Sequence, residues 1–353
     1  MATRVAAVAL PYGGTMTSGS WLQLVERAWD STRLRRRRDR PPTNFRIDAY
    51  VGHGSREGLV VRGRVVDDPA PSEATEGESI RAVLRRTLSV FLTDDLPGVP
   101  LEIRVGSTTT TTTTDSDGYF LCHLPAPDEL TSPWTHGEVG LGAPYRGLEG
   151  RHATRLDVRV PAEDAEFGIL SDIDDTILET GVQRVGRMVL QTLIGSALTR
   201  TPLPGAAALY RDLSRDVNPV FYVSSSPWNL HAFLQQFLRH RDFPLGPVLL
   251  RDLLGGPAGR EPKATRIREV LQTHPHLRFV LVGDSGEEDP QVYADMVREH
   301  PGRVIAVYIR EVRLDPGDGR VERVRDAWDS DVPFFLAADS DAVRRHARSL
   351  GLL

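Results

Sequence analysis

The feature that most constrains the fold is a regular alternation in the second half of the chain, from Glu166 onward. Short apolar runs alternate there with segments whose apolar residues have helical spacing. The runs are FGILSD, PVFYVSSS, RFVLVGD and RVIAVYIRE, and the helix-like segments are NLHAFLQQFLRHR, KATRIREVLQTH and PQVYADMVREH. This pattern is typical of a parallel sheet covered by helices on both faces. We therefore expect an α/β fold for residues 161–353.

Residues 41–160 show a different pattern of short strand-like runs broken by Pro, Gly and Asp. The runs are FRIDAYV, LVVRGRVV, LEIRVG, GYFLCHL and TRLDVRV. They predict a small all-β, sandwich-like domain, with the threonines from Thr108 to Thr114 in an edge strand or loop. No catalytic constellation stands out here, which favours a scaffold or a binding module whose protein partner is unknown.

We expect residues 1–40 to form an N-terminal helical and basic segment. The stretch WLQLVERAWDSTRLRRRRDR at 21–40 places aromatic and aliphatic residues at helical spacing before an arginine cluster. Such a helix could lie on an anionic membrane surface. The favoured alternative is a short helix docked on the next domain, followed by a solvated arginine run.

Composition limits the location and the partners. No run approaches the ~20 apolar residues of a membrane-spanning helix, and Cys122, the only cysteine, cannot form an internal disulfide. The net charge of -5 gives no general attraction to nucleic acid. We expect a cytoplasmic protein without a nucleic-acid partner, at most peripheral at the inner membrane surface.

Polar residues stand where the apolar runs end, and ligands of open α/β sheets bind at those ends. The first run leads into SDIDDT, with Asp172, Asp174 and Thr176. Burying two carboxylates together is costly unless a cation shares the site. A calcium loop is excluded, because its sixth and twelfth positions would be Ile177 and Gln183 instead of Gly and Glu.

The second run ends in SSSPW. Ser226 before Pro227 reads as a helix N-cap and first turn, which would set Ser224 and Ser225 beside the positive start of a helix. Such a turn can bind an anion, or it can be a simple cap.

The run FVLVGD leads into SGEEDP, which supplies Asp284 and Asp289. Glu287 and its neighbour Glu288 are as consistent with a solvated acidic loop as with a place in a site. The string GDSG invites a serine-hydrolase reading, but the chain lacks the proline expected after the next glycine and a positioned His–Asp pair.

Lys263 is the only lysine among 43 basic residues, and it opens a helix-like segment. A cation at a helix start is disfavoured by the helix dipole. We therefore expect an anionic group to compensate it.

The order Asp-x-Asp-x-Thr, Ser, Lys and Gly-Asp resembles the haloacid dehalogenase superfamily of phosphotransferases. The strings SDIDDTILETGV, FYVSSSPWNL, GDSGEEDPQVYADMVREHPGRV and AVYIREV resemble the catalytic domain of the actin-patch-associated phosphatidate phosphatase family over roughly Glu166 to Val312. The resemblance implies a Rossmann-like parallel sheet in residues 161–353, behind the all-β domain.

The resemblance also implies roles for the site residues. Asp172 would be the nucleophile that forms an aspartyl-phosphate, and Asp174 the general acid and base. Lys263 would neutralise both the nucleophile and the incoming phosphate. Phosphate would contact Ser224, Ser225 and Thr176, and Mg²⁺ would be held by Asp172, the Asp174 carbonyl and Asp284, with Asp289 helping to position it.

The implied substrate is phosphatidate, hydrolysed to diacylglycerol and phosphate. The segment 21–40 and the apolar stretch at 187–205 agree with a lipid substrate, although both also have core-packing explanations. Two alternatives stay open: a phosphatase for a soluble phosphomonoester, and a non-catalytic interaction protein on a phosphatase-like scaffold.

Overall fold

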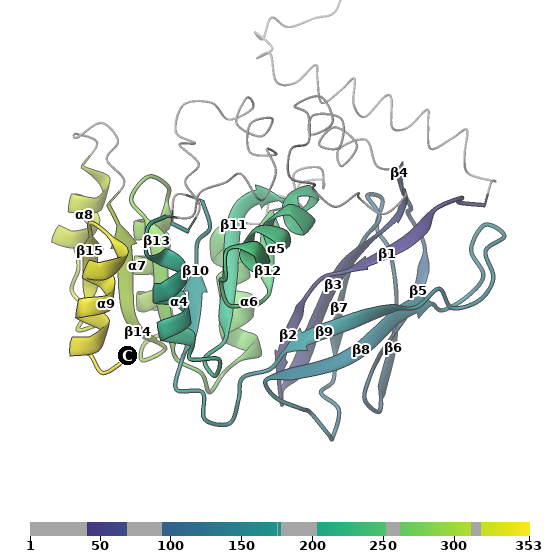
Figure 1. Ribbon diagram of the computed structural model, residues 1–353, viewed down its shortest axis with the longest axis horizontal. Coiled ribbons are helices and arrows are strands. Elements are labelled where there is room, and N and C mark those ends of the chain that lie inside the picture. Colours follow the sequence, from purple (N-terminus) through teal and green to yellow (C-terminus); the bar gives the residue numbers. More distant parts are fainter. Residues whose placement is uncertain (1–40, 69–93, 175, 178–202, 252–261, 312–318) are drawn as a thin grey trace, which may run out of the picture.

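Two sheets lie side by side in the computed structural model (Figure 1). The structure describes residues 41–68, 94–174, 176–177, 203–251, 262–311 and 319–353. The predicted helix at 21–40 and most of the stretch at 187–205 lie outside these residues. No helix in the described ranges is long and apolar enough to cross a bilayer.

The first sheet, which we call the accessory sheet, has nine strands within the described residues. They are β1 (Phe45–Ala49), β2 (Gly52–Ser55), β3 (Gly58–Asp67), β4 (Asp94–Asp95), β5 (Pro100–Val105), β6 (Thr108–Thr113), β7 (Tyr119–Leu124), β8 (Trp134–Leu141) and β9 (Thr154–Arg159). The main order is β1-β3-β2-β9-β8-β5-β6, with β4 and β7 also paired to β3. Only the β2–β9 pair among these is parallel.

The accessory sheet closes around one apolar core. Alternate residues of β3, β5, β7, β8 and β9 point into this core, as Val61, Ile103, Phe120, Val139 and Leu156 illustrate. One face of each strand is buried because its apolar residues recur with period two. The predicted all-β, sandwich-like region is therefore confirmed, with its strands joined into one continuous hydrogen-bonded sheet.

The threonine run forms β6, which ends the strand order beside β5. Its residues alternate between half-buried and exposed. The last threonine of the run, Thr114, is buried, donates from Oγ1 to the carbonyl of Leu96 (2.7 Å) and accepts from the amide of Val99 (2.9 Å). The expectation of an edge strand is confirmed within the described residues.

The second sheet is parallel and has six strands in the described part of the chain. They are β10 (Gly168–Ser171), β11 (Val220–Pro227), β12 (Val248–Arg251), β13 (Phe279–Asp284), β14 (Val304–Arg310) and β15 (Phe334–Ala337). Their spatial order is β12-β11-β10-β13-β14-β15. The chain first builds outward from β10 through β11 and β12, then returns to the other side of β10 with β13, which is the doubly wound arrangement.

Helices cover both faces of this sheet (Figure 1). They are α4 (Ala206–Ser214), the 3-10 turn η2 (Trp228–Leu230), α5 (His231–His240), α6 (Lys263–Thr273), α7 (Asp289–Glu299), α8 (Arg320–Asp326) and α9 (Ser340–Ser349). One apolar core contains α4, α5 and α9, and the other contains α6 and α7. Neighbouring residues Ile169 and Leu170 of β10 point into opposite cores, so the strands are buried on both sides, as their continuous apolar runs predict. The α/β fold class is confirmed.

Two details of the sequence-based prediction were incomplete or wrong. The short strands β12 and β15 were not predicted. The strand β11 continues through Ser226 to Pro227, and η2 begins at Trp228 with no side-chain cap. Ser226 is therefore not the predicted N-cap, and Pro227 is not in a first helical turn.

Asn218 fixes the connection between the two sheets. Its side chain is fully buried, accepts hydrogen bonds from the amides of Glu166 (3.0 Å) and Phe167 (3.4 Å), and donates to the carbonyl of Leu213 (2.9 Å). Because β10 starts at Gly168, these bonds fix the entry to the central strand.

We predict that Asn218→Ala lowers the free energy of unfolding by about 2–3 kcal/mol, because it leaves buried backbone groups without partners. The midpoint of denaturant unfolding measures this effect. The control is Asn44→Ala at an exposed position, where we expect little change. An equal shift in both variants would contradict the role of Asn218.

Candidate active site

The predicted site residues lie at the carboxyl ends of the central strands. Asp172 directly follows β10, Ser224 is in β11, and Asp284 ends β13. The chain order of the sheet reverses between β10 and β13. Open α/β sheets bind ligands in the crevice at this switch point.

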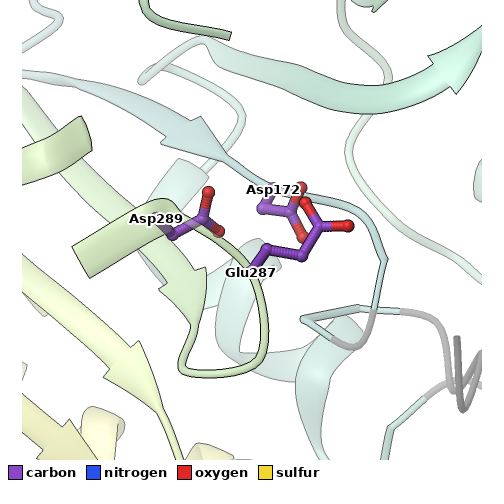
Figure 2. Close-up of side chains that lie close together, drawn as sticks. All are labelled: Asp172, Glu287 and Asp289. Carbon is purple, nitrogen blue, oxygen red and sulfur yellow. The ribbon is translucent and has the colours of Figure 1, made fainter. Parts of the chain in front are cut away.

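Lys263 stands at the centre of a group of carboxylates. Its Nζ lies 2.6 Å from Asp172 Oδ1 and 3.6 Å from Glu287 Oε2, and it donates a short hydrogen bond to Asp289 Oδ1. Its side chain is 8% exposed, and those of Asp172 and Asp289 are fully buried. Figure 2 shows the three carboxyl groups turned toward one another, Asp172 from the loop after β10, Glu287 from the loop between β13 and α7, and Asp289 from the first residue of α7. The expectation of an anionic partner for Lys263 is confirmed.

The opposite charges of Lys263 and Asp289 meet because each residue begins a helix. Lys263 is the first residue of α6, and Asp289 is the first residue of α7, where the dipole favours an acid. The close approach of α7 to β13 requires Gly283, because a Cβ at that position would lie 2.4 Å from Asp289 Oδ2 and 2.8 Å from the Tyr293 ring.

Asp174 is held by hydroxyl groups of β11. Ser224 Oγ donates to Asp174 Oδ2 (2.7 Å), and Ser226 Oγ donates to the same oxygen (3.1 Å). The backbone amide of Ser226 donates in turn to Ser224 Oγ (2.9 Å). The serine run therefore orients a carboxyl group from the end of strand β11.

Asp284 has one oxygen engaged and one without a partner. Oδ1 accepts from the amides of Gly286 (2.5 Å) and Glu287 (3.2 Å). Its Oδ2 and Asp172 Oδ2 are buried and have no hydrogen-bond partner in the described residues. Unpaired buried carboxylate oxygens are costly, and an all-oxygen donor set suits a hard divalent cation.

The carboxylates of Asp172, Glu287 and Asp289 have ligand atoms within 4.8 Å of one another. This buried cluster is consistent with a metal site. Because Lys263 already contacts one oxygen of each carboxylate, the unpaired Oδ2 atoms of Asp172 and Asp284 are the better candidates for metal contact.

Burial and charge shift the pKa values of these groups strongly. Burial raises the pKa of Asp172, which Lys263 opposes and Asp289 reinforces. Burial is the main cause, and the negative charge of Asp289 the second cause, of the rise in the pKa of Asp284 to about 7. Burial alone would lower the pKa of Lys263, but Asp172 and Asp289 outweigh it and raise that pKa well above its usual value. One ammonium thus faces an excess of carboxylates, which a divalent cation would relieve.

The structure gathers the remaining predicted residues less tightly. Thr176 is buried, and its Oγ1 has no hydrogen-bond partner in the described residues. Ser225 Oγ donates to Glu287 Oε2 over 3.4 Å. Glu287 and Ser226 were not predicted as site residues: Glu287 was consistent with a solvated loop, and Ser226 was interpreted as a helix N-cap. The only signal for a site role was their position near Asp289 and Ser224 in the sequence.

Four features together define a haloacid dehalogenase-like α/β domain. They are the doubly wound sheet, the acids that follow its first and fourth strands, the serine of its second strand and the lysine that begins a helix. Residues 167–311 match the family model "Phosphatidate phosphatase APP1, catalytic domain". Over this segment the resemblance noted from the sequence is confirmed.

Two curated fungal proteins are similar to the chain. Phosphatidate phosphatase APP1 of Saccharomyces cerevisiae is 29% identical over 245 residues, which are 65% of this chain and 40% of that protein. An uncharacterized protein of Schizosaccharomyces pombe is 34% identical over 163 residues, which are 44% of this chain and 27% of that protein. The chain thus spans less than half the length of either relative.

Solved structures show weaker similarity. A candidate HAD-like phosphatase from Mesorhizobium loti has a TM-score of 0.36 at 14% identity, covering 64% of this chain and 98% of its own. The class C acid phosphatase of Bacillus anthracis with bound tungstate has a TM-score of 0.29 at 17% identity, covering 47% and 81%.

We predict that Lys263→Met costs about 3–5 kcal/mol of unfolding free energy in chelator-containing buffer, because it leaves buried carboxylates without their cation. A second substitution, Asp289→Asn, should recover part of this loss. Denaturant unfolding of both variants measures the effect. The control is Arg268→Met in the same helix as Lys263, which removes an exposed ion pair with Glu299 of α7 and should change little. Equal losses in Lys263→Met and Arg268→Met would contradict the prediction.

Proposed function

We propose that the protein is a Mg²⁺-dependent phosphatase that hydrolyses phosphatidate to diacylglycerol and phosphate through an aspartyl-phosphate on Asp172. The observation that carries the proposal is the contact between the only lysine in the chain and Asp172, 91 residues away in sequence (2.6 Å, both side chains buried). A buried ammonium beside a carboxylate lowers the repulsion between that carboxylate and an incoming phosphate dianion.

The first step joins Asp172 to the phosphoryl group and breaks the bond from phosphorus to the glycerol oxygen. Asp174, oriented by Ser224 and Ser226, delivers a proton to that leaving oxygen. Asp174 then removes a proton from the water that attacks phosphorus, which releases inorganic phosphate and restores the Asp172 carboxylate.

We propose that Mg²⁺ is held by Asp172, the backbone carbonyl of Asp174 and Asp284, with Asp289 positioning Lys263 beside it. The unpaired Oδ2 atoms of Asp172 and Asp284 support this choice. The ion would supply positive charge toward the phosphoryl oxygens. Ser224, Ser225 and Thr176 would complete the phosphate contacts.

The lipid substrate is proposed from relatedness. The family that matches residues 167–311 and the budding-yeast relative both carry phosphatidate phosphatase in their names. We further propose that the boundary between the all-β domain and the catalytic domain falls at residues 160 and 161, and that the reaction takes place in the cytoplasm at a membrane surface.

The central experiment compares phosphate release from phosphatidate in detergent micelles with release from a panel of soluble phosphomonoesters, with Mg²⁺ and with chelator. We expect release from phosphatidate that chelator abolishes. In Asp172→Asn the release should fall to background, because an amide cannot act as the nucleophile.

The matched control is Asp164→Asn, the same chemical change at an exposed position, which should retain full activity. Preference for soluble esters regardless of micelles would instead support the soluble-substrate alternative. Wild-type inactivity on every substrate would support the non-catalytic alternative and end the proposal.

We also predict that Lys263→Arg lowers kcat by roughly 100-fold or more, the scale of losing one preorganised charge donor. The compact ammonium fits between Asp172, Glu287 and Asp289, whereas a planar guanidinium needs more room and different angles. Steady-state kinetics on phosphatidate micelles measure this effect. Near-wild-type turnover would remove the steric reason for the single lysine.

A further inference from the structure

The accessory sheet contacts the helix that begins with Lys263. Arg62 of β3 donates two hydrogen bonds to Glu269 of α6, from Nη1 to Oε1 (2.7 Å) and from Nη2 to Oε2 (2.6 Å). Ser55 Oγ donates to the carbonyl of Thr273 at the end of the same helix (2.6 Å). Paired Arg–carboxylate bonds fix direction as well as distance.

Arg62 also contacts the segment that follows the serine run. Its guanidinium carbon lies 6.0 Å from the ring centroid of Trp228, the first residue of η2. Tyr50, in the connection between β1 and β2, stacks on Trp228 (ring centroids 5.3 Å apart) and on His231 (3.8 Å). Arg62 therefore lies between α6, which carries Lys263, and η2, which directly follows the serine-bearing strand β11.

The Arg62–Glu269 pair is shielded from water, with side chains 14% and 20% exposed. Burial alone would raise the pKa of Glu269, but the hydrogen bonds from Arg62 and the nearby His53 ring outweigh it and hold that pKa far below its usual value. Burial lowers the pKa of His53, so at neutral pH that ring is uncharged. Arg62 is then the charged partner of Glu269 among the groups that contact it in the described residues.

Helix α6 transmits this contact to the site. Glu269 lies six residues after Lys263, which is roughly 9 Å along a rigid helix. Inside the α/β half, α6 is held by its buried apolar face and by Arg266, which donates to the carbonyls of Leu250 (3.0 Å) and Ser224 (3.2 Å). These contacts hold the middle of the helix, and Arg62 adds a directional constraint one turn further on.

We propose that Arg62 is a positioning residue: the accessory sheet, through the Arg62–Glu269 pair, sets the orientation of α6 and keeps Lys263 on Asp172. The accessory sheet is then part of the catalytic apparatus and not a separate binding module. The expected effect of Arg62 on turnover rests on the proposed function, whereas the position of Lys263 can be measured without any enzymatic activity.

The single lysine supplies that measurement. An amine acylating reagent such as sulfo-N-hydroxysuccinimide acetate modifies only one side-chain amine in this chain, and peptide mass spectrometry gives its rate. We expect Lys263 to be protected in the wild-type protein. In Arg62→Ala and in Glu269→Ala, the modification rate well below the unfolding temperature should rise ~10-fold through local opening of the site.

The matched control is Arg151→Ala, which removes ion pairs to Glu102 and Glu138 within the accessory sheet and should leave Lys263 protected. The double variant Arg62→Ala/Glu269→Ala has no orphaned charge, so it should regain part of the unfolding temperature while Lys263 stays reactive. A double variant in which protection returns with stability would overturn the proposal, as would unchanged protection in the single variants.

Kinetics add a second test. Arg62→Ala should lower kcat on phosphatidate ~10-fold with KM within ~2-fold, because small displacements of a catalytic group act on the chemical step. If the wild-type protein is inactive, the proposed function fails while the modification experiment still decides the role of Arg62. If the wild-type protein is active and Arg62→Ala matches it in both protection and kcat, only the positioning proposal fails.

Discussion

The buried contact between Lys263 and the carboxylates of Asp172 and Asp289 is the constraint on which the rest of the structure depends. Carboxylates packed this closely cannot remain ionised without a cation in reach. The ammonium must therefore arrive from a third element at the point where β10 and β13 end. The sheet order, the two helix starts and the glycine beneath Asp289 all satisfy this requirement.

Helix α6 connects the chemistry to the stability of the molecule. Its first residue contacts the proposed nucleophile, and its middle packs into the core beside β11. Its last carbonyls accept hydrogen bonds from both halves of the chain, with Thr273 bound by Ser55 and Leu271 bound by Arg303. A site residue at one end of a helix can thus be controlled by contacts at the other.

The main strands and helices of the parallel sheet could be predicted because each one has a pattern of apolar residues within a short stretch of sequence. Continuous apolar runs predicted β10, β11, β13 and β14, because a strand that is buried on both faces is apolar along its length and does not alternate with polar residues. The strands β12 and β15 have four residues each, the same length as β10, but no motif of site residues follows them to mark where they end. Lys263 and the acids were found because their types and chain order match a known motif.

What the sequence could not predict depends on contacts between distant residues. Ser226 before Pro227 has the local signature of a helix cap, yet its hydroxyl bonds Asp174 from within a strand. Glu287 resembled a loop acid until the fold placed it 3.6 Å from Lys263. The Arg62–Glu269 pair joins residues 207 positions apart, and no local spacing reports such a pair.

The run of identical residues in β6 affects how the register between β6 and β5 is set. Because its side chains are identical, sliding β6 along β5 would present the same surface to both faces, and the run itself carries no information about register. The observed match of Thr113 to Pro100 must be encoded where the repeat stops, by the inward hydroxyl of Thr114 and the Asp115 carboxylate that binds the amides of Asp117 and Tyr119. Changes in the length of the repeat would accordingly be absorbed at the opposite end, in the turn at Gly106, leaving the locked end in place.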